Sequence, residues 1–139
     1  MDIRYVNRLT GHIKNLQVEG HITLVTLLLE GDLEMKTIVI DTPQSAEYLA
    51  LNQEVNILFK ETEVVIGLEK TNGISLTNKI DCKVQALQRG VLLSGVDLEC
   101  LPGNIRAIVS TEALSDMGIE PGKKVLAMIK LNEVMLSPK

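Results

Sequence analysis

Residues 55–66 (VNILFKETEVVI) recur 70 positions later as residues 125–136 (VLAMIKLNEVML). Without a gap from Gly20 on Gly90 to Ile66 on Leu136, nine of the 47 aligned pairs are identical, whereas ordinary composition gives roughly three. The chain is therefore predicted to be a tandem of two small domains. Because pseudo-symmetric copies present matching edges to each other, the repeat also predicts a site between them.

Short runs in the second copy alternate apolar with polar residues, which predicts strands with one buried face. The segment from Thr111 to Met117 breaks this alternation, begins with a capping residue and stops at Gly118, so it predicts one short helix. The expected strands contain residues 80–84, 96–100, 105–109, 125–129 and 134–136.

The first copy repeats this order, with a helix expected from Thr42-Pro43 to about Leu51. Its strands are expected at residues 9–13, 21–30, 35–40, 53–59 and 64–66. Five strands and one helix per copy predict an all-β chain of two tandem OB-like five-stranded Greek-key barrels. We place the first domain at 1–68, the linker at 69–74 and the second domain at 75–139. The linker is too short to let the domains move independently.

Composition excludes several classes of function. The formal charge is −4, the pI is near 5.2 and aromatic residues make up 2% of the chain, whereas a nucleic-acid-binding barrel needs a basic groove and stacking aromatics. No apolar run is long enough to span a bilayer, and no secretory leader precedes the first strand, so a soluble cytoplasmic protein is expected. Cys82 and Cys100 lack metal-ligand spacing and are expected to be small buried or half-buried thiols.

No enzyme motif is present. Residues 118–124 (GIEPGKK) differ from a phosphate-binding loop in glycine spacing and in the residue after the lysine, and predict a turn before a strand. His12 and His21 lack an acid or nucleophile at a readable spacing, while Glu61 and Glu63 have no matching pair in the second copy. The histidines are expected on the surface or on a strand face, and the two glutamates on a solvated edge. A non-enzyme without cofactor or direct metal ligands is predicted.

A polar bend precedes the first strand of each copy. The bends are residues 4–11 (RYVNRLTG) and 75–82 (SLTNKIDC), and each enters its strand through asparagine, a basic residue and an aliphatic residue. Amides, hydroxyls and a cation in such a bend can point several donors at one place, which is the geometry that a small oxyanion needs. The bends are therefore candidate anion-binding segments.

The second copy resembles a Mop domain, the molybdate-binding form of the TOBE family. The family's Ser-Ala-Arg-Asn motif resembles residues 75–78 (SLTN), and its Ala-x-Ile-Thr stretch leading to Glu-Ser resembles residues 107–113 (AIVSTEA). Its glycine turn resembles residues 117–122 (MGIEPG), and its closing Ala-x-x-Lys strand resembles residues 127–130 (AMIK), with a short hydrophobic end at 133–136. The resemblance covers the second copy and, more faintly, the first, as in a tandem di-Mop protein.

This resemblance implies non-catalytic binding of molybdate or tungstate at interfaces between Mop domains, for intracellular storage or homeostasis. It implies that Ser75 takes the family's serine position, Ser110 its threonine position and Lys130 its strand lysine. Main-chain amides of residues 76–79 would line the same pocket. The oxyanion-binding residues implied in this way are Ser75, Leu76, Thr77, Asn78, Lys79, Ser110 and Lys130.

The first copy keeps less of this motif. Its threonine position is Ile40 and its helix-start position is Pro43. Arg4, Asn7 and Lys60 remain as weaker candidates. The second copy departs from the family at two positions, with Thr77 in place of the motif's arginine and Ala113 in place of the helix-start serine. A site shared between copies, with the second as main donor, is therefore expected.

Two questions stay open at this level. The resemblance also fits a sensor or accessory TOBE module of a molybdate transporter or regulator, which would need a separate partner because the chain has no helix-turn-helix region and no ATPase motif. Hydrophobic strands such as residues 23–29 predict burial against another chain. The resemblance favours a homotrimer, with a dimer as the alternative.

Overall fold

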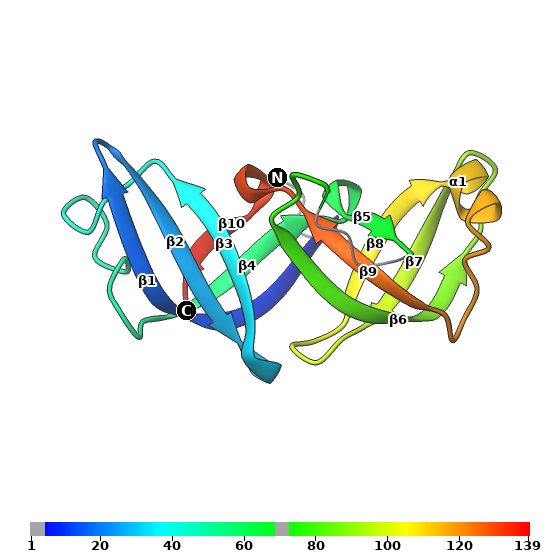
Figure 1. Cartoon of the computed structure of the whole chain (residues 1–139), viewed down its shortest axis with the longest axis horizontal. Helices are drawn as coiled ribbons and strands as arrows, with labels where there is room; N and C mark the ends of the chain where they lie inside the picture. Colours follow the sequence, from blue (N-terminus) through cyan, green and yellow to red (C-terminus); the bar gives the residue numbers. More distant parts are fainter. Residues whose placement is uncertain (1–4, 69–72) are drawn as a thin grey trace.

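The computed structural model describes residues 5–68 and 73–139. It consists of two five-stranded antiparallel sheets that lie side by side (Figure 1). The first contains β1 (Val6–Glu19), β2 (Ile22–Leu29), β3 (Leu33–Val39), β4 (Glu54–Lys60) and β10 (Met135–Pro138). The second contains β5 (Val65–Gly67), β6 (Asn78–Gln88), β7 (Leu93–Glu99), β8 (Ile105–Ser110) and β9 (Lys124–Ile129). The predicted all-β, OB-like tandem fold is confirmed.

The two halves exchange their last strands. In the first sheet the order is β10-β4-β1-β2-β3, and in the second it is β5-β9-β6-β7-β8. The chain thus leaves the first sheet after β4, adds β5 to the edge of the second, and at its other end adds β10 to the edge of the first (Figure 1). Each sheet is incomplete without the other half. The domain boundaries expected at residues 68 and 75 stay a prediction, and residues 69–72 of the expected linker lie outside the described residues.

The strand registers correct the alignment of the two copies at β2. Val25 in β2 corresponds to Val96 in β7, 71 positions later, whereas Met35 in β3 corresponds to Ile105 in β8, 70 positions later. The gap-free alignment from Gly20 was therefore wrong for β2. Turns tolerate such changes in length because the sheet registers on either side are fixed by burial, and here the hairpin between β2 and β3 is one residue longer than its counterpart.

The two helices predicted from sequence differ in outcome. Helix α1 (Thr111–Asp116) forms, and its N-cap is Ser110 rather than Thr111. The segment from Thr42 to about Leu51 forms turns, with a single α-turn in which the Ala46 N–H donates to the Thr42 carbonyl. Ser45 explains part of this difference, because its hydroxyl donates to the Thr42 carbonyl over 3.3 Å, and a side chain that pairs locally with the backbone competes with helix. Within the described residues, no helix has the length and hydrophobicity needed to cross a membrane.

Short 3-10 turns join each exchanged strand to the sheet that it left. These are η3 (Glu61–Glu63), before β5, and η4 (Leu131–Glu133), before β10; a third, η2 (Glu30–Asp32), forms the hairpin between β2 and β3. Thr37 in β3 donates to the Val134 carbonyl over 2.6 Å, and Arg106 in β8 pairs with Glu61 over 3.2 Å. Each crossing segment is therefore held by the edge strand of the opposite half.

Two asparagines clamp the halves together. The Asn7 side chain accepts from the Arg106 N–H and donates to the Arg106 carbonyl, both over 2.8 Å. Asn78 makes the same pair of bonds to Lys36, over 2.7 and 2.9 Å. Lys36 and Arg106 lie in edge strands, so each clamp satisfies backbone groups that the sheet leaves unpaired.

We predict that Asn78→Ala lowers the free energy of unfolding by about 2 to 4 kcal/mol, because the partly buried N–H and carbonyl of Lys36 each lose their partner. Asn7→Ala should lower the free energy of unfolding by a similar amount, because the Arg106 backbone loses the corresponding hydrogen bonds. Urea unfolding measures both, with the exposed Asn132→Ala as the matched control. Changes below about 0.5 kcal/mol in both variants would show that the clamps do not hold the halves together.

Candidate oxyanion-binding site

The polar bend before β6 is open to solvent except at its last residues. Ser75 and Thr77 are exposed, Leu76 and Lys79 are half-buried, and Asn78 is 1% exposed. β6 begins at Asn78, opposite Ile129 of β9. Lys130 follows Ile129 and is exposed, so the fold brings this lysine to the end of β6 where the bend lies. Strand pairing thus groups the expected donors of residues 75–79 with the expected cation.

Asn78 has a structural role that the sequence did not reveal. Its side-chain oxygen and nitrogen are both engaged with the backbone of Lys36. The buried carboxamide therefore positions the start of β6, and its main-chain amide is what it can offer to an anion. The signal was present in the sequence, since both copies have an asparagine at the start of their first strand.

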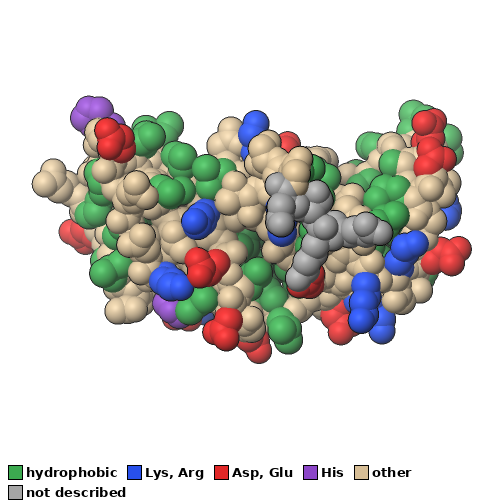
Figure 2. All heavy atoms as spheres, viewed as in Figure 1, with side chains coloured by type: hydrophobic (Ala, Val, Ile, Leu, Met, Phe, Trp, Pro, Cys, Tyr) green, Lys and Arg blue, Asp and Glu red, His purple; other side chains and the backbone are tan. Residues whose placement is uncertain are grey.

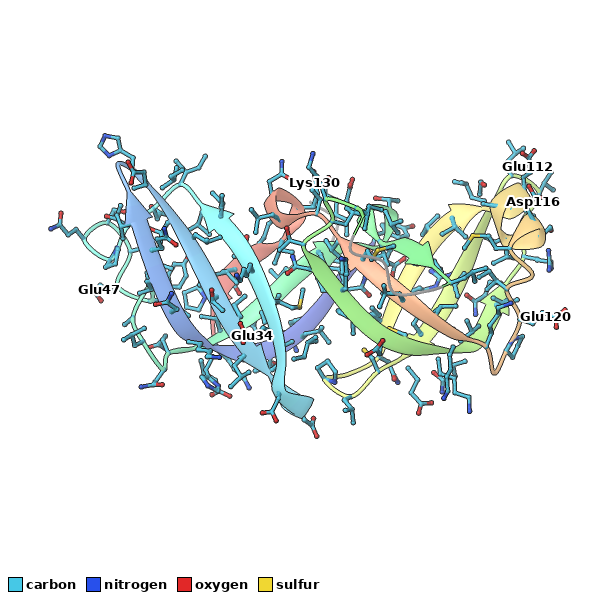
Figure 3. The ribbon with its side chains drawn as sticks, viewed as in Figure 1. Glu34, Glu47, Glu112, Asp116, Glu120 and Lys130 are labelled. Atoms are coloured by element: carbon cyan, nitrogen blue, oxygen red, sulfur yellow. The ribbon has the colours of Figure 1, made fainter. Side chains whose placement is uncertain are left out.

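Ser110 lies elsewhere in the chain. It is the last residue of β8, it is exposed, and its hydroxyl oxygen accepts from the Ala113 N–H over 3.0 Å as the N-cap of α1. A hydroxyl that accepts in this way keeps its own proton to donate to an anion. Figure 3 labels Lys130 near the middle of the molecule and Glu112, two residues after Ser110, at its far end. One chain therefore does not bring Ser110 and Lys130 together.

An apolar hollow of about 290 Å³ adjoins Ser110. Ala113, which stands where the family has a serine, lines this hollow together with Ser110. The remaining lining is aliphatic and comes from β5, the end of β8 and the segment around α1: Val64, Val65, Ile66, Val109, Leu114, Met117 and Ile119. An aliphatic wall cannot hydrogen-bond a dianion, so the hollow itself is suited to an apolar partner.

The weaker candidates of the first copy are placed differently. Lys60 is the exposed last residue of β4 and precedes η3 as Lys130 precedes η4, which makes it the structural counterpart of Lys130. The Asn7 side chain is hydrogen-bonded to the Arg106 backbone, and Arg4 lies outside the described residues. Ile40 is 84% exposed at the place equivalent to Ser110. The first copy therefore keeps the lysine and replaces the hydroxyl with an aliphatic side chain.

The other polar residues weighed from sequence do not form a reaction centre in the described part of the chain. His12 is half-buried opposite Glu54 on β4, and His21 is exposed at a hairpin tip. Glu61 is buried because it pairs with Arg106, so its expected place on a solvated edge was wrong. No group of three or more His, Cys, Asp or Glu side chains that could hold a metal ion is found among residues 5–68 and 73–139.

Comparison with known proteins places the chain in a family. The TOBE domain model matches residues 74–136. Over 64 residues the chain is 36% identical to molybdenum-pterin-binding protein 1 of Clostridium pasteurianum, and this alignment covers 94% of that protein and 45% of the present chain. The chain belongs to the TOBE family. The same alignment length gives 34% identity to molybdenum-pterin-binding protein 2 of that organism.

Similarity also extends over both halves of this TOBE-family chain. The crystal structure of the cytoplasmic molybdate-binding protein ModG with molybdate bound superposes with a TM-score of 0.90, 25% identity and complete coverage of both chains. The molybdenum transport protein ModE of Azotobacter vinelandii is 23% identical over 132 residues, which are 94% of this chain and 49% of ModE. The tandem arrangement is thus shared with a solved protein over its whole length.

Because Ser110 caps α1, Ser110→Ala should lower the free energy of unfolding by about 1 kcal/mol, whereas Ser110→Asn should change it by a few tenths only. Urea unfolding of both variants gives the measurement, with the exposed Ser75→Ala as a control that leaves stability unchanged. Equal stability of Ser110→Ala and the unmodified protein would contradict the assignment of the cap.

Proposed function

We propose that this protein binds molybdate or tungstate without catalysis and captures and releases the anion at equilibrium, for intracellular storage or homeostasis. The observation that carries this proposal is the similarity, over the full length of both chains, to ModG crystallised with molybdate. The identity of the second half to molybdenum-pterin-binding proteins supports the same class of ligand. The polar bend 75–79 supplies the local donors that the proposal needs.

We propose that each complete site is shared between copies of the chain. Ser75, the main-chain amides of residues 76–79 and Lys130 would come from one copy, and Ser110 from another, because a single chain separates Ser110 from Lys130 (Figure 3). Burying a tetrahedral dianion is unfavourable unless its oxygens are hydrogen-bonded. Charge-assisted bonds from amides, hydroxyls and an ammonium group are stronger than neutral ones and can replace the missing guanidinium at Thr77.

We propose assembly into a homotrimer, with a dimer as the alternative. Residues 23–29, expected to be buried against another chain, are mostly buried within this chain, and a different exposed surface supports the proposal. Val91 and Leu92 at the tip between β6 and β7 are 92% and 79% exposed. The Leu92 carbonyl accepts from the Thr111 N–H, so this tip lies beside the start of α1 and the hollow near Ser110. An exposed apolar cluster of this kind marks a contact surface, and covering it with a second copy would bring donors to Ser110.

Two other roles are an accessory or sensor module and a nucleic-acid-binding protein. Similarity to about half of ModE supports an accessory or sensor module that works with a separate partner. Binding of nucleic acid is disfavoured, because the formal charge is −4 and acidic and basic side chains are interspersed on the face drawn in Figure 2. Co-purification with a transporter or regulator subunit would favour the accessory role over storage.

Calorimetric titration of the full chain with molybdate, tungstate and sulfate tests the proposed ligand. Heat with molybdate and tungstate, and none with the smaller sulfate, is the expected result, accompanied by a rise in Tm through preferential binding to the folded protein. No heat and no rise in Tm at millimolar molybdate would overturn the proposal.

Variants test the site itself. Ser75→Ala and Lys130→Ala should each weaken molybdate binding by roughly tenfold or more, because each removes one hydrogen bond to a charged group. Lys60→Ala, the matched change in the first half, should weaken it less. Equal losses for Lys60→Ala and Lys130→Ala would show that the second half is not the main donor.

Light scattering with increasing molybdate tests the shared site. The expected mass is that of a trimer, and Ser110→Ala should reduce affinity without changing that mass. A protein that binds molybdate while it remains a monomer, or a Ser110→Ala variant with the affinity of the unmodified protein, would contradict a site shared between chains.

A further inference from the structure

Cys82 lies in β6, and Cys100 directly follows the neighbouring strand β7. β6 and β7 pair Val84 with Leu98 and Lys83 with Glu99, so continuing this register by one position beyond β7 puts Cys82 opposite Cys100. Partners across an antiparallel ladder have Cα atoms about 4.5 to 5.5 Å apart. That range lies within the spacing of about 4.4 to 6.8 Å that a disulfide spans. Both side chains are free thiols.

Each thiol donates to a main-chain carbonyl. Cys100 Sγ donates to the Gly103 carbonyl over 2.6 Å, and Cys82 Sγ donates to the Ile80 carbonyl over 3.4 Å. Cys82 is 7% exposed, whereas Cys100 is half-buried. The pair therefore has an inner member and an outer member.

An open hollow of about 660 Å³ gives solvent access to the pair. Lys83 and Lys124, which are partners on β6 and β9, line it beside both cysteines. Asp81 and Glu99 also line the hollow, so its charges are mixed. A hollow at the matching place in the first half contains Gly11 where the second has Cys82, so the thiol pair belongs to one half alone.

The surroundings separate the two thiols chemically. The neighbouring Cys82 side chain lowers the pKa of Cys100 below its ordinary value. The neighbouring Cys100 side chain, followed by burial, raises the pKa of Cys82. Thiolate character and access to reagents, rather than packing, decide which cysteine reacts first.

We propose that Cys82 and Cys100 are a reversible thiol modification site, which forms an intramolecular disulfide by exchange with a low-molecular-weight disulfide. Cys100 is the attacking thiol and Cys82 the resolving thiol. This site is separate from the proposed oxyanion-binding residues, and it requires no ligand.

The thiol–disulfide exchange takes place in two steps. The Cys100 thiolate attacks one sulfur of the small disulfide, forms a mixed disulfide with it and releases the other sulfur as a thiolate that takes up a proton. Cys82 then loses its proton and attacks the Cys100 sulfur, so that the second small thiol leaves. Two protein thiols are oxidised to one disulfide, and one small disulfide is reduced to two thiols.

Oxidation would also alter the loop that follows β7. The disulfide removes the thiol proton that Cys100 donates to Gly103. That loop packs on the first half, since a Cβ built on Gly103 would lie 3.1 Å from Leu9 Cδ2 and one built on Gly31 would lie 2.7 Å from Leu101 Cδ1. The modification site is therefore adjacent to a contact between the halves.

Incubation of the reduced full-length protein with oxidised glutathione, followed by acid quenching, alkylation and mass spectrometry, tests this proposal. The expected product loses both alkylation sites, carries no glutathione, yields a peptide that links Cys82 to Cys100 and migrates as a single chain without reductant. Thiols that stay alkylatable at potentials that oxidise free dithiols, or disulfides formed only between chains, would overturn it.

Single variants test the order of attack in the same assay. Cys82→Ser should accumulate a glutathione adduct on Cys100, because the resolving thiol is absent. Cys100→Ser should form an adduct on Cys82 at least about tenfold more slowly. Adducts that form at equal rates in the two variants would overturn the assigned roles, and the linked peptide in the unmodified protein tests the disulfide independently of how either variant folds.

Discussion

Each half of the chain completes its sheet with a strand from the other half, and most of the remaining architecture depends on this exchange. β10 pairs with β4 and β5 pairs with β9, so neither sheet has its five strands without both halves. The Asn7 and Asn78 clamps and the Glu61–Arg106 ion pair then act on segments that the exchange has already brought together. Units of about 65 to 70 residues bury little surface alone, and the exchange lets the two share one contiguous core.

The repeat and the alternation of apolar residues were sufficient to predict the strands, because a period of two reports directly which face is buried. Those signals could not predict the exchange, because β5 and β10 have similar sequences and fit the edge of either sheet. The helix expected after Thr42 does not form, for a local reason, since the Ser45 hydroxyl donates to the Thr42 carbonyl, a group that a helix would use. The one-residue shift at β2 was hidden by chance identities such as Leu28 with Leu98 in the gap-free alignment.

The sequence likewise predicted only part of the candidate site. The motif resemblance identified the bend before β6 and Lys130, and strand pairing does bring these together. It assigned no special role to the Asn78 side chain, because a sequence motif does not separate a side chain that contacts a ligand from one that positions the backbone. It also could not show that Ser110 lies far from Lys130 in space, which depends on how β8 and β9 are arranged (Figure 3). The thiol pair became visible only through the register of β6 and β7.

We propose that a second copy completes the oxyanion site, since the first half has Ile40 where the second has Ser110, and the second half holds Ser110 away from its own lysine. Anomalous diffraction at the tungsten edge, from crystals of the full chain grown with tungstate, locates the anion directly. We expect anomalous density between residues 75–79 and Lys130 of one copy and Ser110 of another. Density enclosed by a single copy, or located at neither segment, would contradict it.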